Sequence, residues 1–274
     1  MAPESSVGFV RPIADSTILV TGATDGLGRA LAGRLHADGA RLLLQGRSPE
    51  RLAALEADLP GVRTLCADLA SLDEVRRLAG EVGELDVLVN NAGIGSGLPE
   101  GRERAESRDG YELRFQVNYL AGYLLTELLL DRLRTPARIV FVASLGQTPL
   151  DFGDVMLERN YTGIQAYCQS KLAQIAYTLA LAERLDAERV TVNSLHPSTF
   201  MPTKMVLAER GAGEDPLEQG VEATYRLVAD PSLDGVSGRF FDRFEESAPH
   251  PWALDRANRE RLVALSEELA APTR

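Results

Sequence analysis

The sequence predicts an α/β fold, a doubly wound parallel sheet in a single domain. Short, almost wholly apolar runs alternate along the chain with longer stretches of helical periodicity, and neither an internal repeat nor a linker divides the 274 residues. Such runs suit strands covered on both faces, and helices between them imply right-handed parallel crossovers. The strands are expected at residues 17–20, 41–44, 62–65, 87–89, 139–142 and 190–194.

Composition limits the class of protein. The chain has 45% hydrophobic residues and no apolar run as long as a membrane span, which favours one globular domain with a large core. We expect residues 1–14 to form a loose N-terminal arm and 15–274 to form the domain, with no membrane span and no secretory signal. A net charge of −11 disfavours a nucleic-acid partner, because a polyanion would be repelled.

The two cysteines, Cys66 and Cys168, lie far apart and lack the spacing of metal ligands. Neither a disulfide framework nor a metal site is therefore expected. This usage predicts the reducing cytoplasm as the compartment.

Two helix starts are marked by capping residues. Ser48 precedes Pro49, a residue that suits the first helical position. Ser71 with Glu74 has the spacing of a capping box.

Two long helices are expected at 111–134 and 161–184. The first contains YLAGYLLTELLL, which is apolar around much of its circumference and needs cover on more than one side. We expect a homodimer formed through these helices, with burial against the chain's own sheet and loops as the alternative.

Three irregular stretches follow predicted strands, at 93–110, 145–163 and 198–215. In a sheet of this kind ligands bind beyond the carboxyl ends of the strands. The sequence therefore predicts that these stretches surround a site.

The glycine-rich stretch LVTGATDGLGRAL, residues 19–31, joins the first strand to the first helix. In that context Gly22 permits the turn, Gly26 lets the backbone approach a pyrophosphate, and Gly28 allows close helix packing. The N–H groups that begin the helix would then face the phosphates. A simple tight corner between strand and helix is the alternative interpretation.

The spacing T-G-x-x-x-G-x-G resembles the short-chain dehydrogenase/reductase family. Its positions are Thr21, Gly22, Gly26 and Gly28, and the likeness continues through NNAG at 90–93. Residues matching the family's catalytic tetrad are Asn118, Ser144, Tyr167 and Lys171. The stretches AYCQSKLA, VNSLHP and SGRFF resemble the retinol-dehydrogenase-like and related bacterial branch. The resemblance implies a Rossmann fold.

The resemblance also implies a dinucleotide cofactor, with Asp68 and Leu69 at the adenine-binding position. NAD-specific members of such folds carry an acidic residue after the second strand, where this chain has Gly46 and Arg47. Arg47 can pair with a 2′-phosphate, so NADP(H) is expected. The residues expected to contact it are Thr21, Gly22, Thr24, Asp25, Gly26, Leu27, Gly28, Arg47, Asp68, Leu69, Asn91, Ala92, Gly93, Tyr167, Lys171, Pro197 and Thr199.

The chemistry implied by the resemblance is acid–base catalysis by Tyr167. Residues four apart share one face of a helix, so Tyr167 and Lys171 would point into one cleft. A nearby ammonium favours loss of the phenol proton. In the family the lysine also holds the nicotinamide ribose, while Ser144 would hydrogen-bond the substrate oxygen and Asn118 would anchor a water that connects Lys171 to solvent.

Each of these residues also has a purely structural interpretation. A Tyr and a Lys four apart are usually a surface pair, Ser144 could cap a turn, and Asn118 could satisfy backbone groups inside a helix. All four falling on family positions favours the catalytic interpretation. His196, beside Pro197 and without a carboxylate motif nearby, is expected to be packed at a strand end rather than to act as a base.

Two stretches depart from the family pattern. Ser198 stands where the family usually has glycine after the sixth strand, and either Thr199 or Thr203 is expected to reach the nicotinamide carboxamide. The stretch PLDFGDVMLERNYTG, between Ser144 and Tyr167, is expected to be a substrate-facing flap that carries Phe152, Met156 and Tyr161, or otherwise a well-packed surface loop.

The function predicted from these features is an NADP(H)-dependent oxidoreductase that interconverts a carbonyl and an alcohol on a fairly apolar small molecule. One alternative is a catalytically silent dinucleotide-binding module that senses cofactor or binds a partner, against which the intact tetrad argues. Another is an epimerase or dehydratase of related architecture, which would usually need a longer chain with a larger substrate region.

Overall fold

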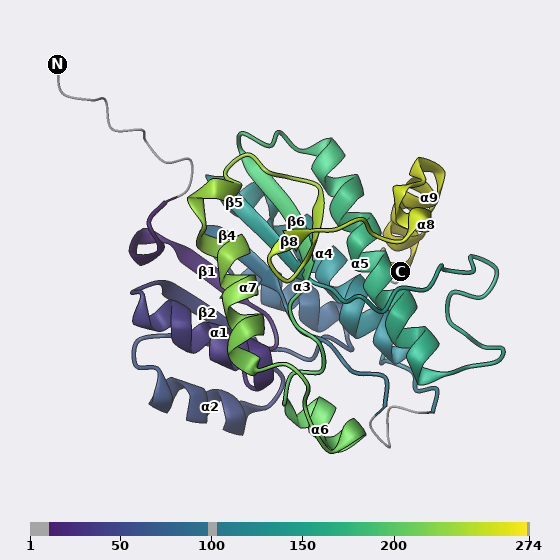
Figure 1. Ribbon diagram of the computed structural model, residues 1–274, viewed down its shortest axis with the longest axis horizontal. Coiled ribbons are helices and arrows are strands. Elements are labelled where there is room, and N and C mark those ends of the chain that lie inside the picture. Colours follow the sequence, from purple (N-terminus) through teal and green to yellow (C-terminus); the bar gives the residue numbers. More distant parts are fainter. Residues whose placement is uncertain (1–10, 98–102, 273–274) are drawn as a thin grey trace.

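The chain forms one eight-stranded sheet with helices packed on both faces (Figure 1). The computed structural model describes residues 11–97 and 103–272. The strand order is β3-β2-β1-β4-β5-β6-β7-β8, and only the β7–β8 pair is antiparallel. The strands are β1 (Thr17–Val20), β2 (Arg41–Gly46), β3 (Arg63–Cys66), β4 (Leu85–Asn90), β5 (Leu133–Val142), β6 (Val190–His196), β7 (Arg239–Asp242) and β8 (Glu245–Glu246).

The predicted doubly wound sheet in a single domain is confirmed. The strand order reverses between β1 and β4, so the carboxyl ends of these two strands flank the point where such sheets bind ligands. All six predicted strands are present, most of them longer than predicted.

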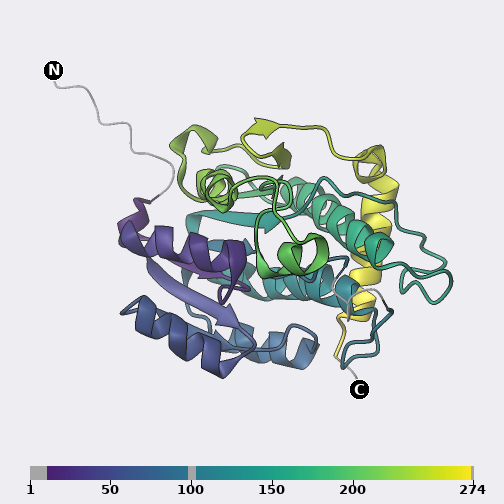
Figure 2. The same ribbon diagram turned by 60° about the horizontal axis from the view of Figure 1, so that its bottom comes forward.

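The helices divide into two layers that Figure 2 shows on either side of the sheet. Buried side chains of α1, α2 and α7 form the core on one face, and those of α3, α4, α5 and α9 form the core on the other. The α-helices are α1 (Gly26–Ala37), α2 (Pro49–Asp58), α3 (Leu72–Glu81), α4 (Ala121–Leu129), α5 (Gly163–Arg184), α6 (Lys204–Arg210), α7 (Leu217–Ala229), α8 (Pro251–Leu254) and α9 (Arg256–Leu269). Short turns are η1 (Ile13–Asp15), η3 (Phe115–Leu120, a π-helix), η4 (Leu130–Arg132) and η5 (Pro231–Leu233).

The helix predicted over 111–134 ends earlier in the structure than predicted. Its helical part runs through η3, α4 and η4 and stops at Arg132, and β5 already begins at Leu133. Pro136 supplies a physical reason, because the residue before a proline is disfavoured in the helical region. The helix predicted over 161–184 is confirmed as α5, whose N-cap Thr162 accepts a hydrogen bond from the N–H of Gln165.

The predicted helix caps are present, with one difference. The Ser48 side chain accepts from the N–H of Arg51, and that of Ser71 accepts from the N–H of Glu74. The Glu74 carboxylate, however, accepts from the N–H of Asp68 at 2.7 Å, so it does not close the capping box on Ser71. Glu74 thereby links the end of β3 to α3.

The N-terminal arm predicted for 1–14 lies mostly outside the described residues. Its described end is not loose: residues 13–15 form η1, and the Arg11 guanidinium lies 3.0 Å from the buried carboxylate of Asp86.

Helix α5 and the η3 segment that leads into α4 are covered by the C-terminal part of their own chain. The Tyr119 hydroxyl lies 2.7 Å from that of Ser266 on α9, and the Tyr111 hydroxyl donates to the carbonyl of Leu269. Every residue of α5 from 169 to 178 is buried. The packing therefore follows the alternative of burial within one chain, and the apolar face that suggested a partner subunit is already occupied.

The homodimer stays a prediction, which the molecular mass in solution tests. Light scattering at micromolar concentration is expected to give twice the chain mass of 29.7 kDa. A mass of 29.7 kDa contradicts the prediction. No helix in the described part of the chain is long and apolar enough to cross a membrane.

Candidate active site

The glycine loop turns tightly between β1 and α1. Gly22 and Gly26 have φ values of +65° and +52°, a region that favours glycine. A Cβ atom at Gly22 would lie 2.8 Å from Cα of Ala92, and one at Gly28 would lie 2.4 Å from the Gly22 carbonyl oxygen. Because α1 begins at Gly26, its first N–H groups lie beside this loop, where an anion can bind.

The ends of β1 and β4 are joined by side chains of the predicted cofactor site. The Thr21 hydroxyl accepts from the N–H groups of Asn91 at 3.0 Å and Ala92 at 3.1 Å. The Asn91 side chain donates to the Thr21 carbonyl at 2.8 Å. The structure therefore gives Asn91 the role of holding the glycine loop in place.

Sequence reasoning missed Gln45, which supports the same loop from β2. Its Oε1 accepts from the N–H of Gly22 at 2.9 Å, and its Nε2 donates to the carbonyl of Ala67 at 2.7 Å. Gln45 is buried. The available signal was a single polar side chain inside the apolar strand RLLLQG, since buried polar groups nearly always have partners.

The carboxyl ends of β2 and β3 carry the residues predicted for the adenosine half of the cofactor. Arg47 is exposed and pairs with no carboxylate in the described part of the chain. Gly46 leaves no room for a side chain, because its Cβ would lie 2.4 Å from Thr24. The Asp68 carboxylate lies 3.6 Å from the Arg108 guanidinium, and Leu69 is buried.

Asn118 lies in η3, and its side chain holds the loop after β4. Its Oδ1 accepts from the N–H of Ile94 at 2.7 Å, and its Nδ2 donates to the Ile94 carbonyl and to the hydroxyl of Ser170 on α5. Three hydrogen bonds to two residues thus fix the Asn118 amide between the loop after β4 and α5.

Ser144 and Tyr167 flank one point at the carboxyl end of β5. A Cβ atom at Gly146 would lie 3.5 Å from the Ser144 hydroxyl, 3.7 Å from the Tyr167 ring and 3.0 Å from the Cys168 sulfur. The Ser144 oxygen accepts from the N–H of Gly146 at 3.0 Å. The structure therefore brings the predicted serine and tyrosine to the same place.

Lys171 lies one helical turn after Tyr167, with its ammonium 5.7 Å from the centre of the Tyr167 ring. Nζ donates to the Val142 carbonyl at 2.8 Å and to Gln174 Oε1 at 3.0 Å. It also lies 3.5 Å from where a Cβ of Gly93 would stand. Burial lowers the pKa of Lys171 to about 7, because the charged form has lost its water.

Thr199 is engaged away from the glycine loop. Its hydroxyl lies 3.1 Å from His196 Nε2 and accepts from Arg243 at 2.8 Å, while its N–H donates to Asp215. As expected, His196 is packed at the end of β6, and burial lowers its pKa to about 4. Thr203 is the threonine that lies against the loop, with its methyl group 3.0 Å from a Cβ position at Gly26.

The stretch 198–215, predicted to be irregular, contains α6 and is closed at its ends. Asp215 N–H donates to the Thr199 carbonyl at 3.1 Å, and Glu214 N–H donates to that of Phe200 at 2.9 Å. Ser198 replaces the usual glycine without a left-handed backbone, and its hydroxyl donates to Asp215 at 3.0 Å. Two other residues of the stretch have a left-handed backbone, Phe200 with φ of 43° and Gly211 with φ of 77°.

The stretch 149–163, predicted to be a substrate-facing flap, is instead a packed surface loop, because its three large side chains contact the rest of the protein. The Phe152 ring stacks on Trp252 of α8 with centroids 5.7 Å apart, and the Met156 sulfur accepts from the N–H of Glu112. The Tyr161 hydroxyl lies 3.2 Å from the buried carboxylate of Glu112. The contacts with Trp252 and Glu112 show that these three side chains face the rest of the protein.

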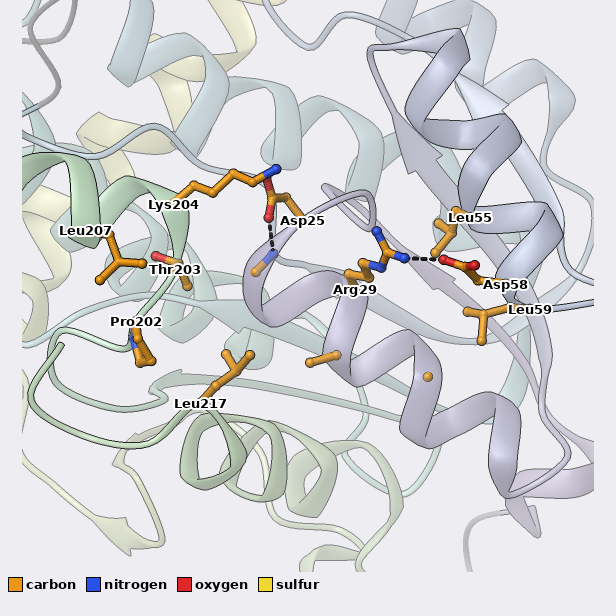
Figure 3. Close-up of a pocket in the computed structure, with 13 residues that line it drawn as sticks. Asp25, Arg29, Leu55, Asp58, Leu59, Pro202, Thr203, Lys204, Leu207 and Leu217 are labelled. Atoms are coloured by element: carbon orange, nitrogen blue, oxygen red, sulfur yellow. Dashed lines mark hydrogen bonds and ion pairs between the residues drawn. The ribbon is translucent and has the colours of Figure 1, made fainter. Parts of the chain in front are cut away.

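A cavity of about 430 Å³ lies beside the glycine loop, between α1, α2, α6 and the start of α7 (Figure 3). Figure 3 shows Lys204 reaching Asp25, the N-cap of α1, and their charged atoms are 3.2 Å apart. The lining of the cavity includes none of Ser144, Tyr167 and Lys171. We therefore do not place the reaction in this cavity.

Comparison with known proteins identifies the class. Residues 16–212 match the family model of the short chain dehydrogenases. The chain is 36% identical to human retinol dehydrogenase 13 over 94% of this chain and 85% of that protein, and 35% identical to human retinol dehydrogenase 14 over 92% and 85%.

Solved structures agree. The fold is similar to that of an uncharacterised protein from Mycobacterium paratuberculosis, with a TM-score of 0.79, 29% identity and 95% of each chain covered. It is also similar to a short chain dehydrogenase from Burkholderia cenocepacia in complex with NADP, with a TM-score of 0.65, 28% identity, and coverage of 85% of this chain and 97% of that one.

The chain therefore belongs to the short-chain dehydrogenase/reductase family. Within that family it is retinol-dehydrogenase-like. Three features of the site fit a nicotinamide dinucleotide. The glycine loop can bind its phosphates, the exposed Arg47 guanidinium has no carboxylate partner among the described residues, and the buried Lys171 ammonium can bind ribose hydroxyls.

Proposed function

We propose that this chain is an NADP(H)-dependent oxidoreductase that interconverts a carbonyl and an alcohol on a fairly apolar small molecule. The observation that carries the proposal is Lys171, an ammonium buried one turn from Tyr167 with no carboxylate paired to it among the described residues. An unpaired buried cation is costly, and a silent binding module has no evident use for it.

The chain's own residues have distinct tasks in this proposal. The bound cofactor supplies or accepts the hydride. Tyr167 donates a proton to the substrate oxygen in reduction and accepts it in oxidation, and Ser144 hydrogen-bonds the same oxygen as its charge develops. Lys171 holds the nicotinamide ribose and favours loss of the Tyr167 proton, while Asn118 keeps the loop after β4 in register with α5.

Exposed apolar side chains near this site support an apolar substrate. Leu145 follows Ser144 directly and is 45% exposed, and Ile164, one turn before Tyr167, is 64% exposed. The relatives named for retinol, an apolar alcohol, favour the same class of substrate.

A screen of carbonyl compounds tests the proposal. The absorbance of NADPH is expected to fall with an apolar aldehyde or ketone, and the product alcohol is expected to reverse the reaction with NADP. Tight NADPH binding without turnover of any carbonyl or alcohol would favour the silent module.

A cytoplasmic location is part of the same proposal, supported by the two free cysteines.

NADPH is expected to bind more tightly than NADH, and Arg47→Ala is expected to weaken NADPH binding about tenfold with little effect on NADH. Arg47 is exposed at the carboxyl end of β2 with its charge free to pair with a 2′-phosphate. Fluorescence titration with both cofactors measures this. Arg63→Ala, an exposed arginine at the opposite end of neighbouring β3, is the matched control. Tighter binding of NADH than of NADPH to the unmodified protein contradicts the prediction.

A further inference from the structure

We propose that Gln174 is a positioning residue for the proposed reaction, because its side-chain amide holds and orients the Lys171 ammonium. This inference rests on the proposed function for its role in turnover. The contact itself can be tested without cofactor or substrate.

The Lys171 ammonium has two acceptors of different kinds. The Val142 carbonyl belongs to β5 and is fixed by the sheet, whereas Gln174 Oε1 comes from the next turn of α5. An ammonium carries three N–H donors, so these two acceptors leave one for a ribose hydroxyl. Losing Gln174 would leave Lys171 tethered at a single point and free to turn about it.

The hydrogen bond to Gln174 also replaces part of the hydration that the Lys171 ammonium loses on burial. The groups that face this ammonium from β5, η3 and the loop after β4 are neutral: the Val142 carbonyl, the Asn118 amide and Gly93. On α5 itself the titratable neighbours are Tyr167, through its ring, and the Cys168 thiol, whose pKa is raised by burial. Carbonyl dipoles, not a carboxylate, therefore stabilise the charge.

A small cavity lies beside the Gln174 side chain. Four polar residues line this cavity of about 10 Å³ together with apolar ones: Thr21, Asn90, Asn118 and Gln174. Its volume suits one water molecule. Asn90 Nδ2 donates to Thr126 at 3.0 Å, but its buried Oδ1 has no partner. Once Gln174 Oε1 has accepted from Lys171, its Nε2 is left as a donor, so a water can join it to Asn90 Oδ1.

The composition of the chain makes a direct test feasible. Among 29 basic residues only Lys171 and Lys204 are lysines. Labelling lysine at Cε or Nζ therefore gives two NMR signals, and Lys204→Arg assigns them. In the unmodified protein without cofactor, the Lys171 signal is expected to titrate near pH 7.

Two substitutions of Gln174 are expected to move this titration in opposite directions. Gln174→Met removes an acceptor at nearly constant volume and is expected to lower the midpoint by about one pH unit. Gln174→Glu places an opposite charge against the ammonium and is expected to raise it by a similar amount. A role in packing alone would move both variants alike or neither.

Gln169→Met is the matched control. Gln169 is a buried glutamine on the same helix, but its Nε2 donates to the Val155 carbonyl at 2.7 Å and it does not contact Lys171. Its substitution is expected to leave the Lys171 midpoint unchanged. If Gln174→Met fails to fold, the rise expected for Gln174→Glu decides the question.

The same variants have a second readout in the pH dependence of carbonyl reduction. In this proposal reduction needs the charged form of Lys171, so the rate of reduction is expected to fall at alkaline pH. We expect this fall to begin at lower pH in Gln174→Met and at higher pH in Gln174→Glu. An unchanged Lys171 midpoint in both variants overturns the proposal. Failure of the proposed function would appear differently, as absent turnover in the unmodified protein with the NMR shifts intact.

Discussion

Tyr167→Phe is expected to lower turnover about 10²- to 10⁴-fold while NADPH binding stays close to that of the unmodified protein. The change removes one hydroxyl and keeps the ring that lies beside Cys168 and the Lys171 ammonium. General acid catalysis is lost, but the contacts that hold a dinucleotide remain. Steady-state rates with the best carbonyl substrate and fluorescence titration with NADPH measure the two effects separately.

Lys171→Ala is expected to behave differently and to weaken both NADPH binding and turnover, since Lys171 has a ribose contact as well as an electrostatic role. Tyr225→Phe on α7, away from the site, is the control for loss of a tyrosine hydroxyl. Full activity of Tyr167→Phe would show that the proton comes from another group.

Arg114→Met is expected to lower the free energy of unfolding by about 3–5 kcal/mol. Arg114 and Glu112 are both buried, with their charged atoms 3.7 Å apart. The arginine also donates to the Gly95 carbonyl at 2.8 Å and to the Tyr161 hydroxyl. Removing it leaves the Glu112 carboxylate buried without its counter-ion and detaches the loop after β4 from the 145–163 stretch. Urea unfolding followed by circular dichroism measures the loss.

A second variant separates charge from packing in this cluster. Glu112→Gln combined with Arg114→Met removes both charges and is expected to recover part of the stability lost in the single variant. Arg256→Met, which breaks the exposed pair with Glu260, is expected to change stability little. Equal losses from Arg114→Met and Arg256→Met would contradict the importance of the buried pair.

The parts of this molecule that were predictable from its sequence depend on local patterns. The apolar runs gave the strands, because a strand covered on both faces needs apolar residues throughout. The glycine loop and the Tyr167–Lys171 spacing each involve only a few neighbouring residues, and both match motifs of the family. Their predicted chemical roles still await the experiments above.

The parts that were not predictable depend on contacts between distant segments. Tyr161 was expected to face a substrate, and no local pattern reveals that its hydroxyl meets Glu112, 49 residues earlier. The cover that α9 gives to η3 and α5 likewise joins segments far apart in the chain. Gln174 was overlooked because an amide inside an apolar helix has no motif of its own.

The paired ends of the 198–215 stretch have a consequence for how relatives of this protein can diverge. Asp215 accepts from Thr199, Ser198 and Arg243, so the entry and exit of this stretch meet at one point beside β6 and β7. Insertions or deletions between them change neither the span to be closed nor β5 and α5, the elements that position Ser144 and Lys171. Residues 200–214 can therefore be transplanted between family members as one unit, and we expect the positions of Ser144, Tyr167 and Lys171 to stay unchanged.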